Sequence, residues 1–168
     1  MVDSHGNLRR QAGAQEIAAT KPDVHAGEVA KIVGSVFKTM LGLQTRLSEH
    51  TWTPQGEWLT SGVDIAGGWS GSVLIQCDRS IACEFAGRFL ATDPPGVTDS
   101  DIRDVLAELA KMIGGNMIRV LAKGIRLATP RVADRGDYRF PAGGAEVRER
   151  IPFECDAGTF RVVVVTTD

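Results

Sequence analysis

The sequence has few of the features that would assign it directly to a class of proteins. Its 168 residues include three cysteines and one tyrosine, and no apolar run approaches the roughly 18 residues that a membrane-spanning helix needs. Lys and Arg number 19 against 21 Asp and Glu, so the net charge is −2 and the basic excess of a nucleic-acid surface is missing. The N-terminus also lacks the apolar core of a signal peptide. We therefore expect a cytoplasmic protein that binds neither nucleic acid nor membrane.

The common motifs of catalytic and metal sites are missing as well. Cys77, Cys83 and Cys155 have no CxxC spacing and the histidines are scattered, so small buried thiols are a better interpretation than disulfides or a zinc site. There is no glycine-rich phosphate loop, GxSxG or HExxH. The stretch GGWSG at 67–71 lacks the GxSxG order, and we interpret it as a hairpin turn. The sequence thus predicts no metal and no cofactor of its own.

Hydrophobic periodicity predicts an α+β fold. Residues 1–22 show little periodicity and suggest a flexible tail, so we expect one domain over residues 23–168. The domain should contain a mainly antiparallel sheet covered on one face by two long, related helices, with one shorter helix. Thr98-x-x-Asp101 resembles a capping box at the start of the second long helix. The predicted helices span about 24–42, 79–91 and 99–124, and the predicted strands 43–50, 57–66, 72–77, 125–132, 136–141, 147–155 and 159–166.

The two long helices have nearly the same sequence. Residues 28–41 read EVAKIVGSVFKTML, and residues 108–121 read ELAKMIGGNMIRVL. Glu, Lys and Gly recur at equivalent places in addition to the apolar positions, which chance amphipathicity does not explain. This internal repeat predicts two pseudo-symmetric half-domains.

Each long helix also carries a polar stripe opposite its apolar face. At about 100° per residue, one narrow sector of the second helix holds Asp104, Glu108, Lys111, Gly115 and Arg119, and the first helix holds Glu28, Lys31, Ser35 and Lys38 in the same way. The stripe is either a solvated face with weak Glu–Lys pairs or a surface for a partner. Gly114 and Gly115 favour a close approach at this point, by another surface or by the other helix, because each costs about 1 kcal/mol of helix propensity relative to alanine.

The segment AELAKMIGGN within DIRDVLAELAKMIGGNMIRVL resembles the signature helix of the CheX/CheC/FliY family of chemotaxis phosphatases. That family typically has an Asp or Ser, a Glu four residues later, an Asn three residues further, and a Pro after the following strand. Asp104 and Glu108 match the first two positions, and Pro130 follows at a somewhat short spacing. FKTMLGL and GTFRVVVV are also similar to CheX proteins, so the resemblance covers roughly residues 24–166.

The resemblance implies a partner protein, a phosphorylated CheY-type response regulator. In the family, the Glu holds a lysine of the regulator and the Asn positions the water that attacks its aspartyl phosphate, while any Mg²⁺ belongs to the regulator. The resemblance also implies a homodimer formed through sheet strands. The catalytic positions would be Glu108 and Lys111, and the residues that would contact the partner are Asp104, Glu108, Gly114, Gly115, Arg119, Glu28 and Lys31.

Lys111 stands where the family has its catalytic Asn. An amide both donates and accepts hydrogen bonds, whereas an ammonium has three donors and no acceptor, so it cannot orient a water by accepting its proton. Asn116 is eight residues from Glu108 and about 80° off the stripe, which favours a structural role. Three hypotheses therefore stay open: an active phosphatase, a non-catalytic module that binds receiver domains, and a structural or dimerisation domain.

Overall fold

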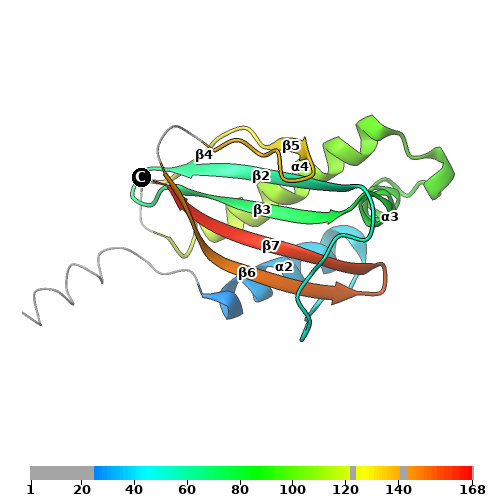
Figure 1. The fold of residues 1–168 in the computed structure, drawn as a ribbon, viewed down its shortest axis with the longest axis horizontal. Helices are drawn as coiled ribbons and strands as arrows, with labels where there is room; N and C mark the ends of the chain where they lie inside the picture. The colour runs from blue at the N-terminus through cyan, green and yellow to red at the C-terminus, as the bar shows by residue number, and fades with distance from the viewer. Residues whose placement is uncertain (1–24, 122–123, 141–143, 168) are drawn as a thin grey trace, which may run out of the picture.

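The computed structural model describes residues 25–121, 124–140 and 144–167, which form one antiparallel sheet with helices behind it (Figure 1). The predicted tail, residues 1–22, lies outside the described residues. The elements in chain order are α2 (Ala26–Leu41), β1 (Arg46–Leu47), β2 (Trp58–Ala66), β3 (Gly71–Asp78), α3 (Arg79–Leu90), the 3₁₀ turn η1 (Pro94–Gly96), α4 (Asp99–Met117), β4 (Arg126–Leu127), β5 (Arg131–Asp134), β6 (Ala145–Cys155) and β7 (Gly158–Thr167).

The sheet has the strand order β1-β6-β7-β3-β2-β4, with β5 also paired to β2, and all of these pairings are antiparallel. Each half of the chain supplies a long helix and a hairpin, and the first half adds one short strand, β1, whereas the second adds two, β4 and β5. The hairpins β2–β3 and β6–β7 meet at the centre, where Leu74 of β3 lies opposite Val163 of β7. Each short strand pairs with the hairpin of the other half. This symmetric order is compatible with two related halves.

The helices α2 and α4 cover the same face of the sheet and run in opposite directions, and α3 lies at one end (Figure 1). Val73 and Ile75 of β3 belong to the core beneath the helices, while Leu74 between them belongs to a separate cluster on the other face. Phe37 of α2 stacks on Phe160 of β7 with ring centroids 4.7 Å apart. The predicted α+β class and helix-covered sheet are confirmed.

The ends of the long helices follow from their sequences. Gly42 ends α2 in the left-handed region, with φ 65°, and its backbone N–H bonds the Lys38 carbonyl oxygen. Thr98 begins α4 with the predicted capping box, because its hydroxyl accepts from the Asp101 N–H at 3.0 Å and the Asp101 carboxylate accepts from the Thr98 N–H at 3.0 Å. The helix stops at Met117 and not at Gly124, since a turn follows in which the Val120 N–H bonds the Met117 carbonyl.

Several predicted strands differ from the structure. The stretch 43–50 contributes only the two residues of β1, and the stretch 125–132 is divided into β4 and the start of β5. Pro130 lies between the two and has no N–H to donate to a ladder. The strand predicted at 159–166, in contrast, is confirmed as β7, and its four valines at 162–165 are buried between β3 and β6 at the centre of the sheet. Within the predicted strand 136–141, residues 136–140 have no strand pairing, and residue 141 lies outside the described part.

The segment that follows β5 covers the second face of the sheet. Tyr138 packs on Leu74 and Val163, and its hydroxyl donates to Asp64 Oδ1 at 3.0 Å. Arg131 donates to the other carboxylate oxygen of Asp64 at 2.7 Å and lies 4.5 Å above the Tyr138 ring. Burial first, and then Asp64, raises the pKa of Tyr138, so the phenol stays protonated and donates. Side-chain contacts therefore hold this segment where the sequence alone predicted a strand.

Candidate functional site

The polar residues of α2 and α4 lie on the exposed side of the helices. Glu28, Lys31, Asp104 and Lys111 are exposed, and Glu108 is partly exposed. The two helices contact each other and cover one face of the sheet (Figure 1). Their exposed sides, which carry these polar residues, form the outer surface of the helix layer. We call this surface the helix ridge. It consists of Glu28, Lys31, Ser35 and Lys38 on α2 and Asp104, Glu108 and Lys111 on α4.

Of the glycine pair predicted for this surface, Gly114 is turned toward the sheet, whereas Gly115 is only partly buried. Gly114 is buried, and a Cβ added there would lie 2.6 Å from Val63 Cγ1 of β2 and 3.3 Å from Leu127 Cδ2. A Cβ on Gly115 would make only an ordinary contact, 3.8 Å from Leu127 Cδ1. The close approach that these glycines predicted is thus made by strand β2 within the chain. Gly114 belongs to the core beneath α4 and does not lie on the helix ridge.

Two other residues near the end of α4 are placed apart from the ridge. The Asn116 side chain donates to the Met112 carbonyl oxygen at 2.8 Å and is partly buried. This is the structural role favoured by its position in the sequence. Arg119 is exposed but follows the end of α4, in the turn where its N–H bonds the Asn116 carbonyl oxygen. Arg119 therefore lies beyond the helix that carries Glu108.

Several contacts fix α4 against the rest of the fold. The buried Ser61 of β2 donates its hydroxyl to the Leu106 carbonyl oxygen at 2.7 Å, two residues before Glu108. Arg103 donates to Asp99 at 3.1 Å and to Asp134 of β5 at 2.6 Å. Because these contacts hold both the first turns and the middle of the helix, the side chains of Glu108 and Lys111 extend from a rigid support.

Glu108 and Lys111 are one turn apart but are not joined. Among the described residues, neither side chain has a hydrogen bond or an ion pair, and the same is true of Asp104. Other helical pairs in the molecule do form, such as Arg88 with Glu84 at 3.4 Å and Arg103 with Asp99 at 3.1 Å. The carboxylate of Glu108 and the ammonium of Lys111 are therefore both available to an external partner.

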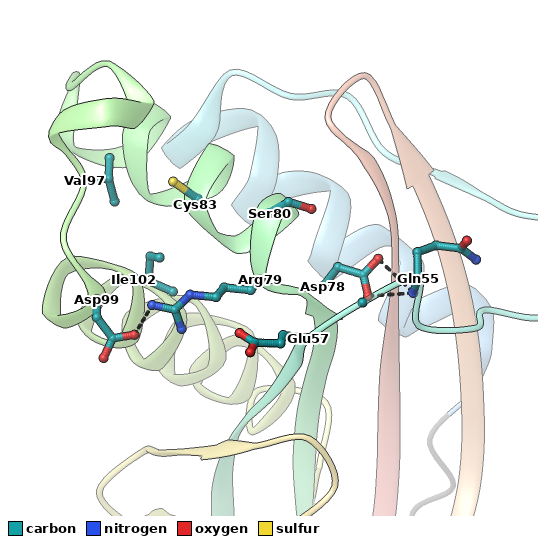
Figure 2. A pocket seen from close by; sticks show the side chains of 10 residues that line it. Gln55, Glu57, Asp78, Arg79, Ser80, Cys83, Val97, Asp99 and Ile102 are labelled. Atoms are coloured by element: carbon teal, nitrogen blue, oxygen red, sulfur yellow. Dashed lines mark hydrogen bonds and ion pairs between the residues drawn. The ribbon is translucent and has the colours of Figure 1, made fainter.

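A cavity of about 530 Å³ opens at the start of α4, apart from Glu108 and Lys111. Figure 2 shows Arg79 reaching from the start of α3 to Asp99 at the start of α4. Hydrogen bonds from Arg79 and then Arg103 lower the pKa of Asp99. Asp78, the residue before α3, does not cap this helix with its side chain, which accepts from the Gln55 N–H at 3.1 Å. Because the ion pair of Arg79 with Asp99 links the start of α3 to the start of α4 here, we interpret this region as a structural joint between the two helices.

This joint was missed by the sequence analysis. The spacing of Asp99 and Arg103 was visible as an i,i+4 pair, but nothing in the sequence indicated that Arg79 and Asp134 converge on it. Long-range pairs of this kind depend on the packing of α3 and β5 against α4.

The three thiols and the possible metal ligands offer no second site. Cys77 and Cys155 are buried and Cys83 is partly buried, and all are free. Burial raises the pKa of the Cys77 thiol, so it stays protonated. Over residues 25–121, 124–140 and 144–167, no group of three or more His, Cys, Asp and Glu side chains could hold a metal ion. In the same part of the chain, no helix has the length and apolar character to cross a membrane.

The chain matches the family model for the chemotaxis phosphatase CheX over residues 59–154, which is more than half of its length. The chain belongs to the CheX family. The match includes α4 with Glu108 and Lys111 but begins after α2, so it does not include Glu28 and Lys31. No curated protein matches the chain.

Solved CheX structures share this fold. CheX from Vibrio vulnificus has a TM-score of 0.65 at 18% identity, covering 85% of this chain and 95% of that one. CheX from Desulfovibrio desulfuricans has a TM-score of 0.60 at 20% identity, covering 84% and 99%. A complex of CheX with CheY, BeF₃ and Mg²⁺ from Borrelia burgdorferi has a TM-score of 0.60 at 19% identity, covering 86% and 98%. At these identities the likeness establishes the fold.

Proposed function

We propose that this CheX-family protein binds a phosphorylated CheY-type response regulator through the helix ridge, with α4 as the main contact, and that it does not speed hydrolysis of the aspartyl phosphate. This partner would place the protein in the cytoplasm. The family match and the CheX–CheY complex of the Borrelia burgdorferi relative support the choice of partner. The observation that carries the proposal is that α4 presents an unpaired carboxylate and an unpaired ammonium at Glu108 and Lys111, but no amide on the same side of the helix.

Glu108 supplies the docking contact. Its carboxylate is partly exposed and has no partner among the described residues, so binding a lysine of a receiver domain would break no existing ion pair. Partial burial also shields such a pair from water more than a fully exposed site would, which strengthens its electrostatic attraction. A lysine–glutamate contact at this position would orient α4 across the receiver.

The lack of hydrolysis follows from Lys111. In-line attack on phosphorus depends on a positioned water, and an ammonium has no acceptor with which to hold it. Asn116 does not replace the missing amide, because it lies about 80° around the helix from Glu108 and its side chain is tied back to the Met112 carbonyl oxygen. In α2 the residue three positions after Glu28 is also a lysine, Lys31, so the first helix offers no amide at that spacing either.

Binding and turnover can be measured separately. Purified CheY-type receivers, free and activated with BeF₃⁻, are titrated with the protein by calorimetry, and phosphate release is followed from receivers phosphorylated with acetyl phosphate. We expect saturable binding that Glu108→Arg abolishes, with no acceleration of phosphate release. We expect Lys111→Asn to add hydrolysis. Arg139→Asn is the control, because it removes the same charge from an exposed position in the segment on the opposite face of the sheet.

The outcomes separate the three hypotheses. Acceleration of phosphate release by the unmodified protein would show an active phosphatase and refute the non-catalytic proposal. Failure to bind any receiver, with or without BeF₃⁻, would refute the proposal that the partner is a CheY-type receiver. It would favour a structural or dimerisation domain.

We also propose a homodimer, through the outer edge of β6. The strand β1 pairs only with Phe153 and Glu154, so most of that edge has no neighbouring strand among the described residues. An unpaired edge is a template for strand addition. Sedimentation velocity over a range of concentrations tests this proposal, and a monomer at every concentration would contradict it.

A further inference from the structure

Lys111 has a second consequence, which concerns the lifetime of the phosphorylated partner. Its side chain is exposed at the middle of the helix ridge and is joined neither to Glu108 nor to Asp104, although both carboxylates lie on the same side of α4. An ammonium that already neutralised one of these carboxylates would have little attraction for another anion. Here the positive charge is left available.

The chemistry of an ammonium suits phosphoryl oxygens. It carries three donors and a full positive charge, and charge-assisted hydrogen bonds to such oxygens are among the stronger ones in proteins. The ridge holds three lysines, Lys31, Lys38 and Lys111, against three carboxylates, Glu28, Asp104 and Glu108. It is therefore balanced in charge and does not repel an anionic group presented by a partner.

The support of Lys111 is rigid, and no amide lies beside it on the same side of α4. Ser61 holds the Leu106 carbonyl, and Gly114 lets α4 lie directly on Val63, so the helix has little freedom to withdraw. The nearest amide on α4, Asn116, is engaged with the Met112 carbonyl. A phosphoryl group covered by this part of α4 would be held by a cation and screened from solvent.

We propose that the protein stabilises the phosphorylated state of its partner: Lys111 binds the phosphoryl oxygens of the receiver and α4 keeps water from the phosphorus, so that the acyl phosphate lasts longer in the complex than in the free receiver. This inference rests on the proposed docking to a CheY-type receiver. The protein then acts as a phosphorylation-dependent binding partner that preserves the signal. Hydrolysis, in which water attacks phosphorus and the bond to the aspartate oxygen breaks, is the reaction that the complex slows.

The test follows the decay of a ³²P-labelled CheY-type receiver at increasing concentrations of the protein, with binding measured in parallel. We expect the decay rate to fall in proportion to the bound fraction. Lys111→Ala should weaken binding to the BeF₃⁻-activated receiver by roughly tenfold or more, the effect of losing a hydrogen bond to a charged group, and should remove the protection. Binding to the receiver without BeF₃⁻ should change much less, and Arg139→Asn should behave like the unmodified protein.

Two results would overturn this inference without touching the docking proposal. One is a bound receiver that loses phosphate as fast as, or faster than, the free receiver. The other is a Lys111→Ala protein that binds and protects as well as the original. Absence of binding to every receiver would instead overturn the docking proposal and this inference together. Circular dichroism of each variant confirms that the exposed substitution leaves the fold intact.

Discussion

Adjacent glycines at 114 and 115 allow the seating of α4 on the sheet to be tested with a matched pair of substitutions. Alanine at either position gains up to about 1 kcal/mol of helix propensity. At Gly115 the new methyl meets Leu127 at an ordinary 3.8 Å, so Gly115→Ala should raise the free energy of unfolding by up to about 1 kcal/mol. At Gly114 the methyl would lie 2.6 Å from Val63 Cγ1, on a short side chain that is fully buried.

Relieving that clash requires α4 or β2 to shift. Overpacking of this kind costs about 1–3 kcal/mol, so after the propensity gain Gly114→Ala should lower the free energy of unfolding by about 0–2 kcal/mol. The two variants should therefore differ by about 1–3 kcal/mol, and each 1 kcal/mol moves the melting temperature of a domain of this size by about 2–4 °C. Urea and thermal unfolding measure both quantities.

A double-mutant cycle isolates the contact. Val63→Ala removes the methyl groups that Gly114→Ala would meet, so the two changes together should be less destabilising than the sum of their separate effects. Equal stabilisation by alanine at 114 and 115 would refute the close approach of α4 to β2. It would also leave the glycine at position 114 without a physical explanation. The argument that α4 gives Lys111 a rigid support would then lose one of its contacts.

Three further predictions concern the ridge, the joint at the start of α4 and the second face. Glu108→Arg should abolish receiver binding with unchanged circular dichroism and melting temperature, and retained binding would contradict the docking role of this carboxylate. Because Arg79 and a second arginine hold the pKa of Asp99 below its usual range, the stabilisation from these pairs is present above the unfolded pKa and is lost as pH falls through the lower folded value. Acid unfolding below about pH 4 should therefore be less steep for Asp99→Asn, and identical pH profiles would exclude this linkage. Tyr138→Phe should lower the free energy of unfolding by about 0.5–1.5 kcal/mol through loss of the bond to Asp64, and an unchanged urea midpoint would show that this bond contributes nothing.

Local patterns predicted the elements well where the sequence carries its own signals. The periodicity of α2, the capping box of α4 and the apolar runs of β3 and β7 are properties of neighbouring residues, so each could be derived without a partner element. The predictions were wrong where tertiary contacts decide. The segment 136–140 is held by Tyr138 on Asp64 and not by a ladder, and the stretch after α4 is divided at Pro130.

In the candidate site, too, some features followed from the sequence and others are explained only by tertiary contacts. Exposure of Asp104 and Lys111 followed from the helical period alone. The inward direction of Gly114 did not, because a glycine carries no side chain whose polarity reveals its environment, and only the position of Val63 explains it. Whether Glu108 pairs with Lys111 also could not be derived from spacing, since an i,i+3 pair is worth only a few tenths of a kcal/mol. The structure leaves the two apart, and both phosphoryl binding and docking depend on that separation.

The most direct test of the receiver-binding surface is solution NMR of the ¹⁵N-labelled protein titrated with a BeF₃⁻-activated CheY-type receiver. We predict that the amide signals that shift most come from α4 around residues 104–111, with a second group on the exposed side of α2. Shifts confined to the edge of β6, or to the face covered by Tyr138, would contradict the account.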